Sequence, residues 1–342
     1  MKKKLLVTGG TGYIGSHTIV QLLESNNYEV IAIDNFSNSS LEVAQRVKSI
    51  TGKSFELIEG DIREKRILES IFSNNQICAV IHFAGLKAVG ESEKNPIKYY
   101  DNNVVGSLNL LKVMTKNNIK NIVFSSSATV YGKSKCFKFK ENTPPCPINV
   151  YGRNKLIVEN ILYDLKKTEP DWRVAILRYF NPIGAHKSGL IGDNPNGIPN
   201  NLMPFISQVA LGKRKKLKVF GGDYETFDGT GRRDYIHVDD LAVGHLLSLS
   251  YILKEKIPPF LKLNLGTGLS TSVLDLIKAF ERVSCRKIKY EIVDRRFGDV
   301  AESVADPSLA KAIINWEAKY NIKRMCEDSW RWQRKNPNGY DF

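Results

Sequence analysis

Short apolar runs alternate with longer amphipathic segments through the first half of this 342-residue chain. The apolar runs predict β-strands at 5–8, 29–34, 55–59, 79–83, 122–125 and 174–178. The segments between them show helical spacing of apolar residues, most clearly at 14–25, 67–72, 107–115 and 151–165. Buried strands that alternate with helices are typical of a parallel sheet covered on both faces. We therefore expect a doubly wound α/β fold.

The composition of the sequence changes after Asn181. Gly, Pro and Asn cluster from Gly189 to Asn201, which indicates a loop or linker. The remainder predicts strands at 217–220, 262–265 and 287–292 and helices at 273–282, 308–314 and 325–333. We expect two domains, a larger one over 1–180 and a smaller mixed α/β one over 181–342, with some exchange of chain between them.

Charge and composition narrow the class of protein. The net charge is +14, with basic runs at Lys213–Lys216 and from Lys133 to Lys140. No nucleic-acid-binding motif accompanies these runs, so we expect no nucleic-acid partner and instead an anionic small-molecule substrate. No apolar run approaches the ~20 residues needed to span a bilayer, and the one after Lys4 is too short for a secretion signal, so we expect a cytoplasmic protein without membrane contact. The five scattered cysteines show no ligand spacing, which predicts free thiols and no metal site.

A glycine-rich turn directly follows the first predicted strand. Gly9, Gly12 and Gly15 permit a tight turn at which backbone N–H groups and the following helix N-terminus meet a pyrophosphate. Asp34 closes the second strand, where a carboxylate accepts hydrogen bonds from ribose and repels a 2′-phosphate, so NAD is favoured over NADP. Asp61 follows the third strand and is a candidate contact for the adenine amino group. The small residues Ala84 and Gly85 end the fourth strand and leave room for the cofactor in a Rossmann-type fold.

Tyr151 and Lys155 are spaced so that they share one face of a helix. A tyrosine has an ordinary pKa of ~10, and a nearby ammonium together with a cationic nicotinamide ring would favour the phenolate needed for a base. This spacing alone carries little information. It gains weight from the serine cluster that follows the fifth strand, in which Ser127 is the best candidate to contact a reacting substrate oxygen and Thr129 lies beside it.

Together, these motifs resemble the extended short-chain dehydrogenase/reductase superfamily. Longer stretches narrow the resemblance to the UDP-glucose 4-epimerases, and it covers essentially the whole chain. The stretches are 82–92, 99–103, 125–132, 177–182, 197–204, 228–231 and 233–238.

The resemblance implies an NAD-dependent isomerase that oxidises C4 of a UDP-hexose, lets the 4-keto sugar turn, and reduces its other face. It implies a homodimer and Tyr151, Lys155 and Ser127 as catalytic residues. The implied cofactor site comprises Gly9, Gly12, Tyr13, Ile14, Gly15, Asp34, Asn35, Asp61, Ile62, Phe83, Ala84, Gly85, Lys87, Asn102, Tyr151, Lys155 and Tyr179. The implied substrate site comprises Lys87, Ser127, Thr129, Tyr151, Asn181, Asn201, Leu202, Phe220, Arg233, Arg296, Asp299 and Ser303.

Two positions bear on how far the resemblance extends. Val150 stands where the family commonly has a proline before the tyrosine, and we expect no loss of chemistry from it. Ser303 falls where family members carry either a bulky or a small residue. A small one leaves room for an N-acetyl group at C2, so we hypothesise that UDP-N-acetylglucosamine and UDP-N-acetylgalactosamine are also substrates.

Three other functions compete with this interpretation. A related nucleotide-sugar 4,6-dehydratase would need an acid after Thr129, and Val130 stands there. A non-catalytic NAD sensor on the same fold would not need Ser127, Tyr151 and Lys155 together. A basic nucleic-acid binder is the weakest of the three, because only the net charge supports it.

Overall fold

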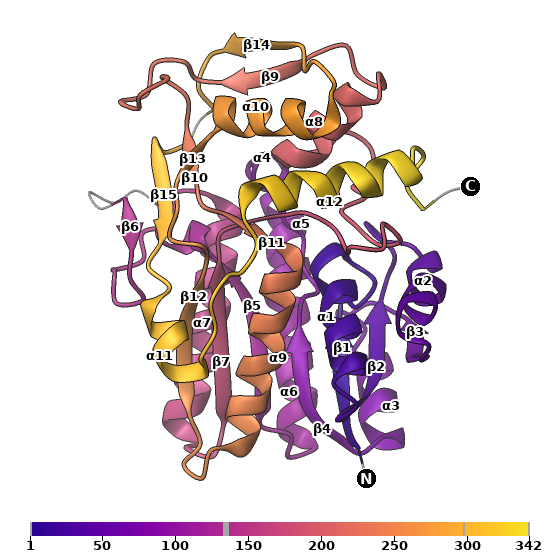
Figure 1. Cartoon of the computed structure of the whole chain (residues 1–342). Coiled ribbons are helices and arrows are strands. Elements are labelled where there is room, and N and C mark those ends of the chain that lie inside the picture. The colour runs from indigo at the N-terminus through magenta and orange to yellow at the C-terminus, as the bar shows by residue number, and fades with distance from the viewer. Residues whose placement is uncertain (1, 133–136, 297, 341–342) are drawn as a thin grey trace. The chain divides into compact units, whose positions relative to one another are not determined.

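The computed structural model describes residues 2–132, 137–296 and 298–340 (Figure 1). The chain forms two compact units, each built from three stretches of sequence. Unit 1 comprises Met1–Lys133, Thr143–Tyr179 and Ala242–Leu263, and unit 2 comprises Ser134–Asn142, Phe180–Leu241 and Asn264–Phe342. Part of the basic run from Lys133 to Lys140 lies outside the described residues. Cys136 belongs to that part.

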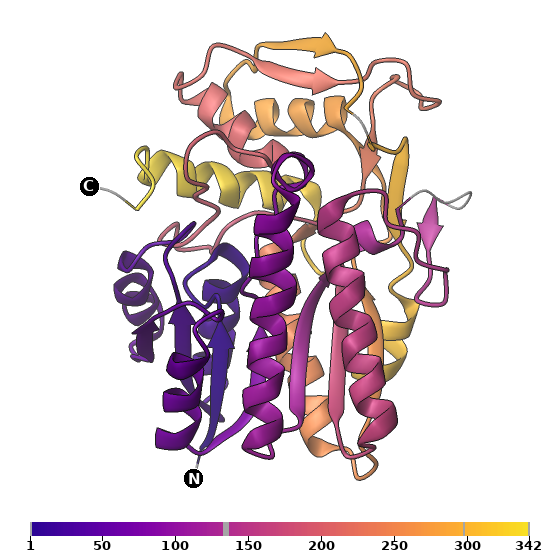
Figure 2. The ribbon, with the colours of Figure 1, turned by 180° about the vertical axis from the view of Figure 1, so that it is seen from behind.

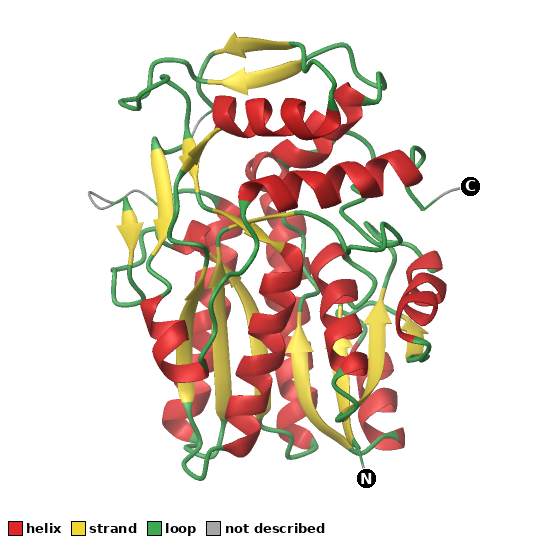
Figure 3. Ribbon diagram, in the orientation of Figure 1, coloured by secondary structure: helices red, strands yellow, loops and turns green. Residues whose placement is uncertain are grey.

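A seven-stranded sheet in the order β12-β7-β5-β4-β1-β2-β3 is the framework of unit 1 (Figure 3). All strand pairs from β3 across to β7 are parallel. The strands are apolar on both faces because helices cover both, and Leu5, Leu6 and Val7 in β1 are completely buried. The strand bounds are β1 (Lys3–Thr8), β2 (Tyr28–Asp34), β3 (Glu56–Glu59), β4 (Ile77–His82), β5 (Asn121–Ser127), β7 (Arg173–Tyr179) and β12 (Phe260–Leu265).

Helices pack on the two faces of this sheet. On one face α3, α6 and α7 share a core that includes Leu68, Met114 and Leu162 (Figure 2). On the other face lie α1 and α9 (Figure 1). The fold class predicted from the sequence is therefore confirmed. The bounds are α1 (Tyr13–Glu24), α2 (Glu42–Thr51), α3 (Lys65–Asn74), α4 (Val89–Lys94), α5 (Pro96–Tyr99), the π-helix η1 (Tyr100–Val105), α6 (Gly106–Lys116), the 3₁₀-helix η2 (Ala128–Val130), α7 (Val150–Thr168) and α9 (Val238–Lys254).

Unit 2 is built from short strands and three longer helices. Its four-stranded sheet has the order β13-β10-β15-β6, and two further strand pairs are β11-β8 and β14-β9. A core with Ile206, Phe280 and Met325 joins the helices α8, α10 and α12. The bounds are β6 (Lys138–Phe139), β8 (Asn181–Ile183), α8 (Leu202–Ala210), β9 (Leu217–Phe220), β10 (Arg232–Arg233), β11 (Tyr235–His237), β13 (Thr271–Ser272), α10 (Val273–Ser284), β14 (Tyr290–Val293), β15 (Glu302–Ala305), α11 (Ser308–Ile314) and α12 (Ile322–Lys335).

The sequence predicts most of these elements well in the first half and less well in the second. All six strands predicted there are present, and their ends lie within two residues of the predicted ends. The strand predicted at 262–265 is present as β12, but it joins the seven-stranded sheet rather than a sheet of the second half. The long helix α9 was not predicted, because its nearly continuous apolar sequence lacks a clear amphipathic pattern.

Candidate active site

The glycine turn between β1 and α1 leaves no space for side chains. A Cβ atom on Gly9 would lie 2.8 Å from the backbone nitrogen of Ala84, and one on Gly15 would lie 2.3 Å from the carbonyl oxygen of Gly9. Gly12 stands at the N-cap of α1 and offers no side-chain cap to the first N–H groups of that helix. Such a helix N-terminus can bind an anionic group through its backbone donors.

Asp34 closes β2 beside this turn and is almost completely buried. Its carboxylate accepts hydrogen bonds from the backbone N–H groups of Thr11 (3.1 Å) and Phe36 (3.1 Å) and from the Ser39 hydroxyl (2.8 Å). The N–H of Thr11 belongs to the glycine turn. The carboxylate is therefore fixed at the edge of the turn.

Asp61 follows β3, and its neighbour Ile62 is buried. Burial alone would raise the pKa of Asp61, but hydrogen bonds from Arg63 and from the Asn35 amide (2.7 Å) outweigh it and lower the pKa to about 2. Arg63 also contacts Asp101 at 2.7 Å. Asp61 is thus an oriented, ionised acceptor.

The loop after β4 carries the predicted residues Phe83 to Lys87. The N–H of Ala84 donates to the Thr8 hydroxyl (3.2 Å), and the Asn103 side chain accepts from Leu86 N–H (2.7 Å) and donates to its carbonyl (3.0 Å). The Lys87 ammonium lies 5.9 Å from the centre of the Tyr13 ring. Asn102, which the resemblance implies as a cofactor contact, is half-buried on η1.

The helix α7 begins at Val150 because the Asn149 side chain accepts a hydrogen bond from Gly152 N–H (2.8 Å) and caps it. Tyr151 and Lys155 therefore lie on one face, one turn apart, and both are buried. The Lys155 ammonium donates to the Ser125 carbonyl (2.7 Å) and lies 5.8 Å from the centre of the Tyr151 ring. The predicted pair is assembled as the spacing indicates.

Burial controls the protonation of this pair. It raises the pKa of Tyr151 to about 12, and a hydrogen bond with Ser127 opposes that rise. It lowers the pKa of Lys155 to about 8, and the Glu159 carboxylate opposes that fall. A positive charge on Lys155 favours the Tyr151 phenolate, so the pair can exchange a proton with an alcohol.

Each of the three serines that end β5 has a different partner. Ser127 Oγ accepts from both the N–H (3.2 Å) and the hydroxyl (2.9 Å) of Thr129, so its own O–H proton is left to be donated. The hydroxyl of Ser125 contacts that of Tyr179, and the hydroxyl of Ser126 donates to Glu159. Ser127, the serine selected from the sequence, is the one that faces Tyr151.

In unit 2 the predicted substrate residues fall into small groups. Arg296 lies with its guanidinium 4.5 Å from the centre of the Phe220 ring and donates to the Asp299 carboxylate (3.2 Å). Arg233 on β10 is the register partner of Ser303 on β15. The guanidinium and carboxylate next to one aromatic ring suit a nucleotide, with the ring available for stacking on a base.

The other predicted residues of unit 2 lie at the starts of elements. Asn181 opens β8, its side chain is exposed, and its N–H donates to the Asp234 carbonyl (3.0 Å). Asn201 is the N-cap of α8, with Leu202 as the first residue of the helix. The Asn201 amide contacts the Asp193 carboxylate at 3.3 Å.

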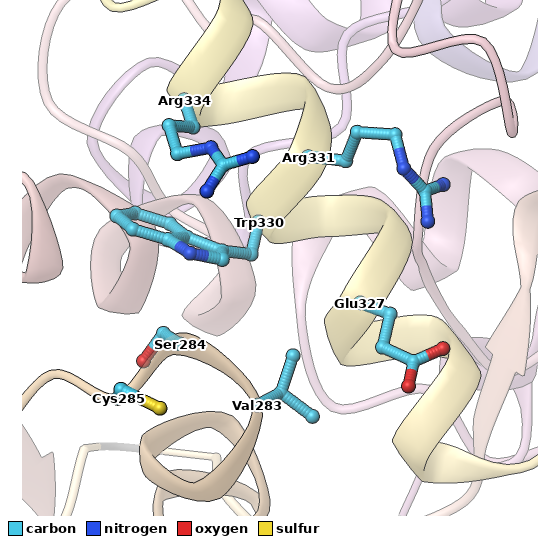
Figure 4. A pocket seen from close by; sticks show the side chains of 7 residues that line it. All are labelled: Val283, Ser284, Cys285, Glu327, Trp330, Arg331 and Arg334. Atoms are coloured by element: carbon cyan, nitrogen blue, oxygen red, sulfur yellow. The ribbon is translucent and has the colours of Figure 1, made fainter.

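A pocket of about 410 Å³ lies between the end of α10 and α12 in unit 2 (Figure 4). None of the predicted site residues lines it; Trp330, Arg331 and Arg334 do, together with Cys285. Among the described residues no group of three or more His, Cys, Asp or Glu side chains is arranged to hold a metal ion. No helix in the described ranges is both long and apolar enough to cross a membrane.

Sequence reasoning missed three side chains that border the predicted set. His245 on α9 lies 4.7 Å from Phe83 and 6.0 Å from Tyr179, measured between ring centres. Asn103 holds the loop after β4, and Glu159 lies one helical turn beyond Lys155. Glu159 could have been found from its spacing of four after Lys155, whereas His245 depends on the unpredicted packing of α9.

Comparison with known proteins agrees with this geometry. Residues 5–261 match the family described as NAD dependent epimerase/dehydratase. The UDP-glucose 4-epimerase of Bacillus subtilis (strain 168) is 54% identical over 336 residues, covering 98% of this chain and 98% of that protein. That of Neisseria meningitidis serogroup C is 55% identical over 340 residues, covering 99% of each chain. The crystal structure of the Bifidobacterium longum UDP-glucose 4-epimerase with NAD⁺ and UDP is similar at a TM-score of 0.95 and 49% identity, covering 98% of this chain and 100% of that one.

Proposed function

The chain belongs to the NAD-dependent epimerase/dehydratase family, and we propose that it catalyses the reversible C4 epimerisation of UDP-glucose and UDP-galactose. The observation that carries this proposal is the assembly of Tyr151, Lys155 and Ser127 beside a glycine turn built for a dinucleotide. The reaction is a reversible oxidation without net redox, which passes through a 4-keto sugar.

The residues of unit 1 fit NAD. The turn can pack this tightly only because Gly9 and Gly15 carry no Cβ atoms, and the first turn of α1 has donors without a side-chain cap. Asp34 would hold the adenosine ribose, with Asp61 and Asn35 near the adenine. Bound NAD supplies the hydride acceptor and, after the sugar has turned, the hydride donor.

The proton is handled by the chain's own residues. Tyr151 takes the proton of the sugar 4-hydroxyl and later returns it, while the Lys155 ammonium stabilises the phenolate. Ser127 contributes through its hydroxyl proton, which Thr129 leaves available for donation. The carbonyl of Ser125 fixes the position of Lys155.

We assign the UDP-sugar to unit 2. Arg233 and Arg296 would bind the diphosphate, Phe220 would pack beside the uracil, and Asp299 would hold the uridine ribose. Asn181, Asn201 and Leu202 complete the proposed site in unit 2. In unit 1, Lys87 is a further proposed substrate contact, and Tyr179 belongs with the proposed cofactor contacts. Binding energy concentrated on UDP leaves the hexose free to present either face.

The small size of the Ser303 side chain supports a wider substrate range. Ser303 lies on β15 opposite Arg233 and is small. We therefore propose that the enzyme also epimerises the N-acetylated UDP-hexoses. Side-by-side turnover of both substrate pairs tests this, and absence of any turnover of the N-acetylated pair rejects it.

We also propose a cytoplasmic homodimer. The exposed apolar side chains Val89, Ile97 and Val105 on α4, α5 and η1 offer a surface that a second copy would bury. The four cysteines in the described ranges are free thiols, which agrees with a reducing compartment. Sedimentation of the parent and of the Ile97→Lys/Val105→Lys variant tests the assembly; equal masses would reject the proposed surface.

Incubation of the purified protein with UDP-galactose tests the main proposal. UDP-glucose should form without added cofactor, because NAD remains bound through the cycle. Chromatographic separation of the two nucleotide sugars gives the readout. No conversion in protein shown to carry NAD would refute the proposed reaction.

A further inference from the structure

A buried ion pair lies directly behind the proposed proton-transfer pair of unit 1. Glu159 on α7 and Arg178 on β7 have side-chain exposures of 4% and 2%. The Arg178 Nε donates to both carboxylate oxygens (3.0 and 3.2 Å), and its Nη2 donates at 2.5 Å. A hydroxyl hydrogen bond from Ser126 on β5 completes the site. The helix α7 is thus fastened to both strands beneath it (Figure 2).

Stability alone explains such a pair poorly. Desolvating two charges is costly, and a buried pair can often be replaced by apolar residues without loss of stability. The pair is therefore a candidate for a role in the chemistry. Glu159 follows Lys155 by four residues, just as Lys155 follows Tyr151, so the three side chains form one stripe on α7.

The titratable groups around this stripe come from several elements. They are Tyr151 and Glu159 on α7, His82 at the end of β4, Arg178 and Tyr179 on β7, Tyr99 on α5, and Tyr131 after η2, whose ring centre lies 4.9 Å from the Arg178 guanidinium. Burial lowers the pKa of His82 to about 3 and raises the pKa of both Tyr99 and Tyr179, so these three are neutral at physiological pH. Of these groups, Glu159 is the anion whose field acts on the Lys155 ammonium.

We propose that Glu159, held in place by Arg178 and Ser126, is a positioning residue that keeps Lys155 charged and so sustains the Tyr151 phenolate. This inference rests on the proposed epimerase reaction. Glu159 touches neither sugar nor cofactor; it acts through Lys155. Arg178 has the complementary task of holding the carboxylate in place through its hydrogen bonds.

The test measures kcat against pH for UDP-galactose conversion by the NAD-bound enzyme. Glu159→Gln keeps the side-chain shape but removes the anion, so Lys155 should lose its proton at lower pH. We expect the alkaline limb of the profile to move down by on the order of one pH unit. Glu159→Asp retains the charge and should restore most of the parental limb.

A double variant separates charge from packing. Glu159→Gln/Arg178→Gln removes both charges, so its alkaline limb should lie between those of the parent and Glu159→Gln. This variant leaves no unpaired buried charge, so it remains informative if Glu159→Gln folds poorly.

Two results are decisive in different ways. The inference would be overturned if Glu159→Gln and the double variant both kept an alkaline limb within about 0.2 pH units of the parent, with only the melting temperature lowered. The ion pair would then have a structural role alone. Failure of the parent itself to convert UDP-galactose would instead overturn the proposed function.

Discussion

Replacement of Tyr151 by phenylalanine removes the proposed base while leaving its surroundings intact. The ring is buried in a small apolar cluster with Tyr99 and Val150, and phenylalanine fills the same volume. The lost groups are one hydroxyl and its hydrogen bond with Ser127. We therefore expect a local chemical defect and no rearrangement of α7.

The expected fall in kcat follows from the role of the Tyr151 phenol as general base. With the Tyr151 oxygen gone, no other group in the set can take the proton of the 4-hydroxyl, since Lys155 is committed to the Ser125 carbonyl. General acid–base catalysis is typically worth ~10²–10⁴ in rate, or roughly 3–5 kcal/mol of barrier. We expect kcat to fall by that factor. Loss of one hydrogen bond should cost only about 1 kcal/mol of folding free energy.

The assay follows UDP-glucose formed from UDP-galactose at several substrate concentrations, with bound NAD quantified in each preparation. Tyr163→Phe is the matched control, because Tyr163 lies on the same helix but is exposed. It should retain parental kcat. A Tyr151→Phe enzyme with kcat within threefold of the parent, or one that lost activity only because it lost NAD, would refute the role of Tyr151 as base.

Three further predictions concern other parts of the molecule. Gly15→Ala places a Cβ 2.3 Å from the Gly9 carbonyl oxygen, so this variant should lose NAD on purification. Gly90→Ala is the control, because a Cβ there has nothing within 4 Å, and it should keep NAD. Bound NAD is measured after heat denaturation, and equal NAD contents in the two variants would contradict NAD binding at the glycine turn. His82 has a pKa held by burial at about 3 against 6.5 when unfolded, so the unfolded state binds the extra proton between these values and the protein loses stability as pH falls through this window. His82→Gln should flatten that loss, by about 2 kcal/mol between pH 7.5 and 5 in urea melts, and an unchanged pH dependence would count against it. Ser303→Tyr should abolish turnover of the N-acetylated UDP-hexoses but spare UDP-galactose, and equal loss of both in the turnover assay would contradict the proposed role.

The first-half fold could be predicted because each apolar run there is bounded by turn residues and followed by a helical pattern. The same pattern gives no information on which sheet a strand joins. The strand at 262–265 is the clear example, since it pairs next to β7 although eighty residues lie between β7 and β12. The π-helix at Tyr100–Val105 could not be predicted either. Next to it the Ser107 hydroxyl contacts the His82 ring (2.8 Å) and donates to the Asn103 carbonyl (2.6 Å), and the contact with His82 joins residues that are distant in the sequence.

The candidate site could be predicted where a motif is local and not where partners meet in space. The glycine turn and the Tyr151–Lys155 spacing are local, and both have the predicted form. The separate partners of Ser125 and Ser126 could not be foreseen, since Tyr179 and Glu159 reach them only after α7 and β7 have packed against β5. The roles of the unit 2 residues remain predictions that depend on the resemblance.

The path of the chain through the two units limits how such enzymes can be recombined. The backbone passes from one unit to the other five times, so neither unit is encoded by a continuous half of the gene. A hybrid gene joined at residue 180 would insert β12 of one parent into the sheet of the other, and would pair β6 of the first with β15 of the second. Exchange of substrate specificity between relatives therefore requires a transplant of three segments, 134–142, 180–241 and 264–342, in a single design.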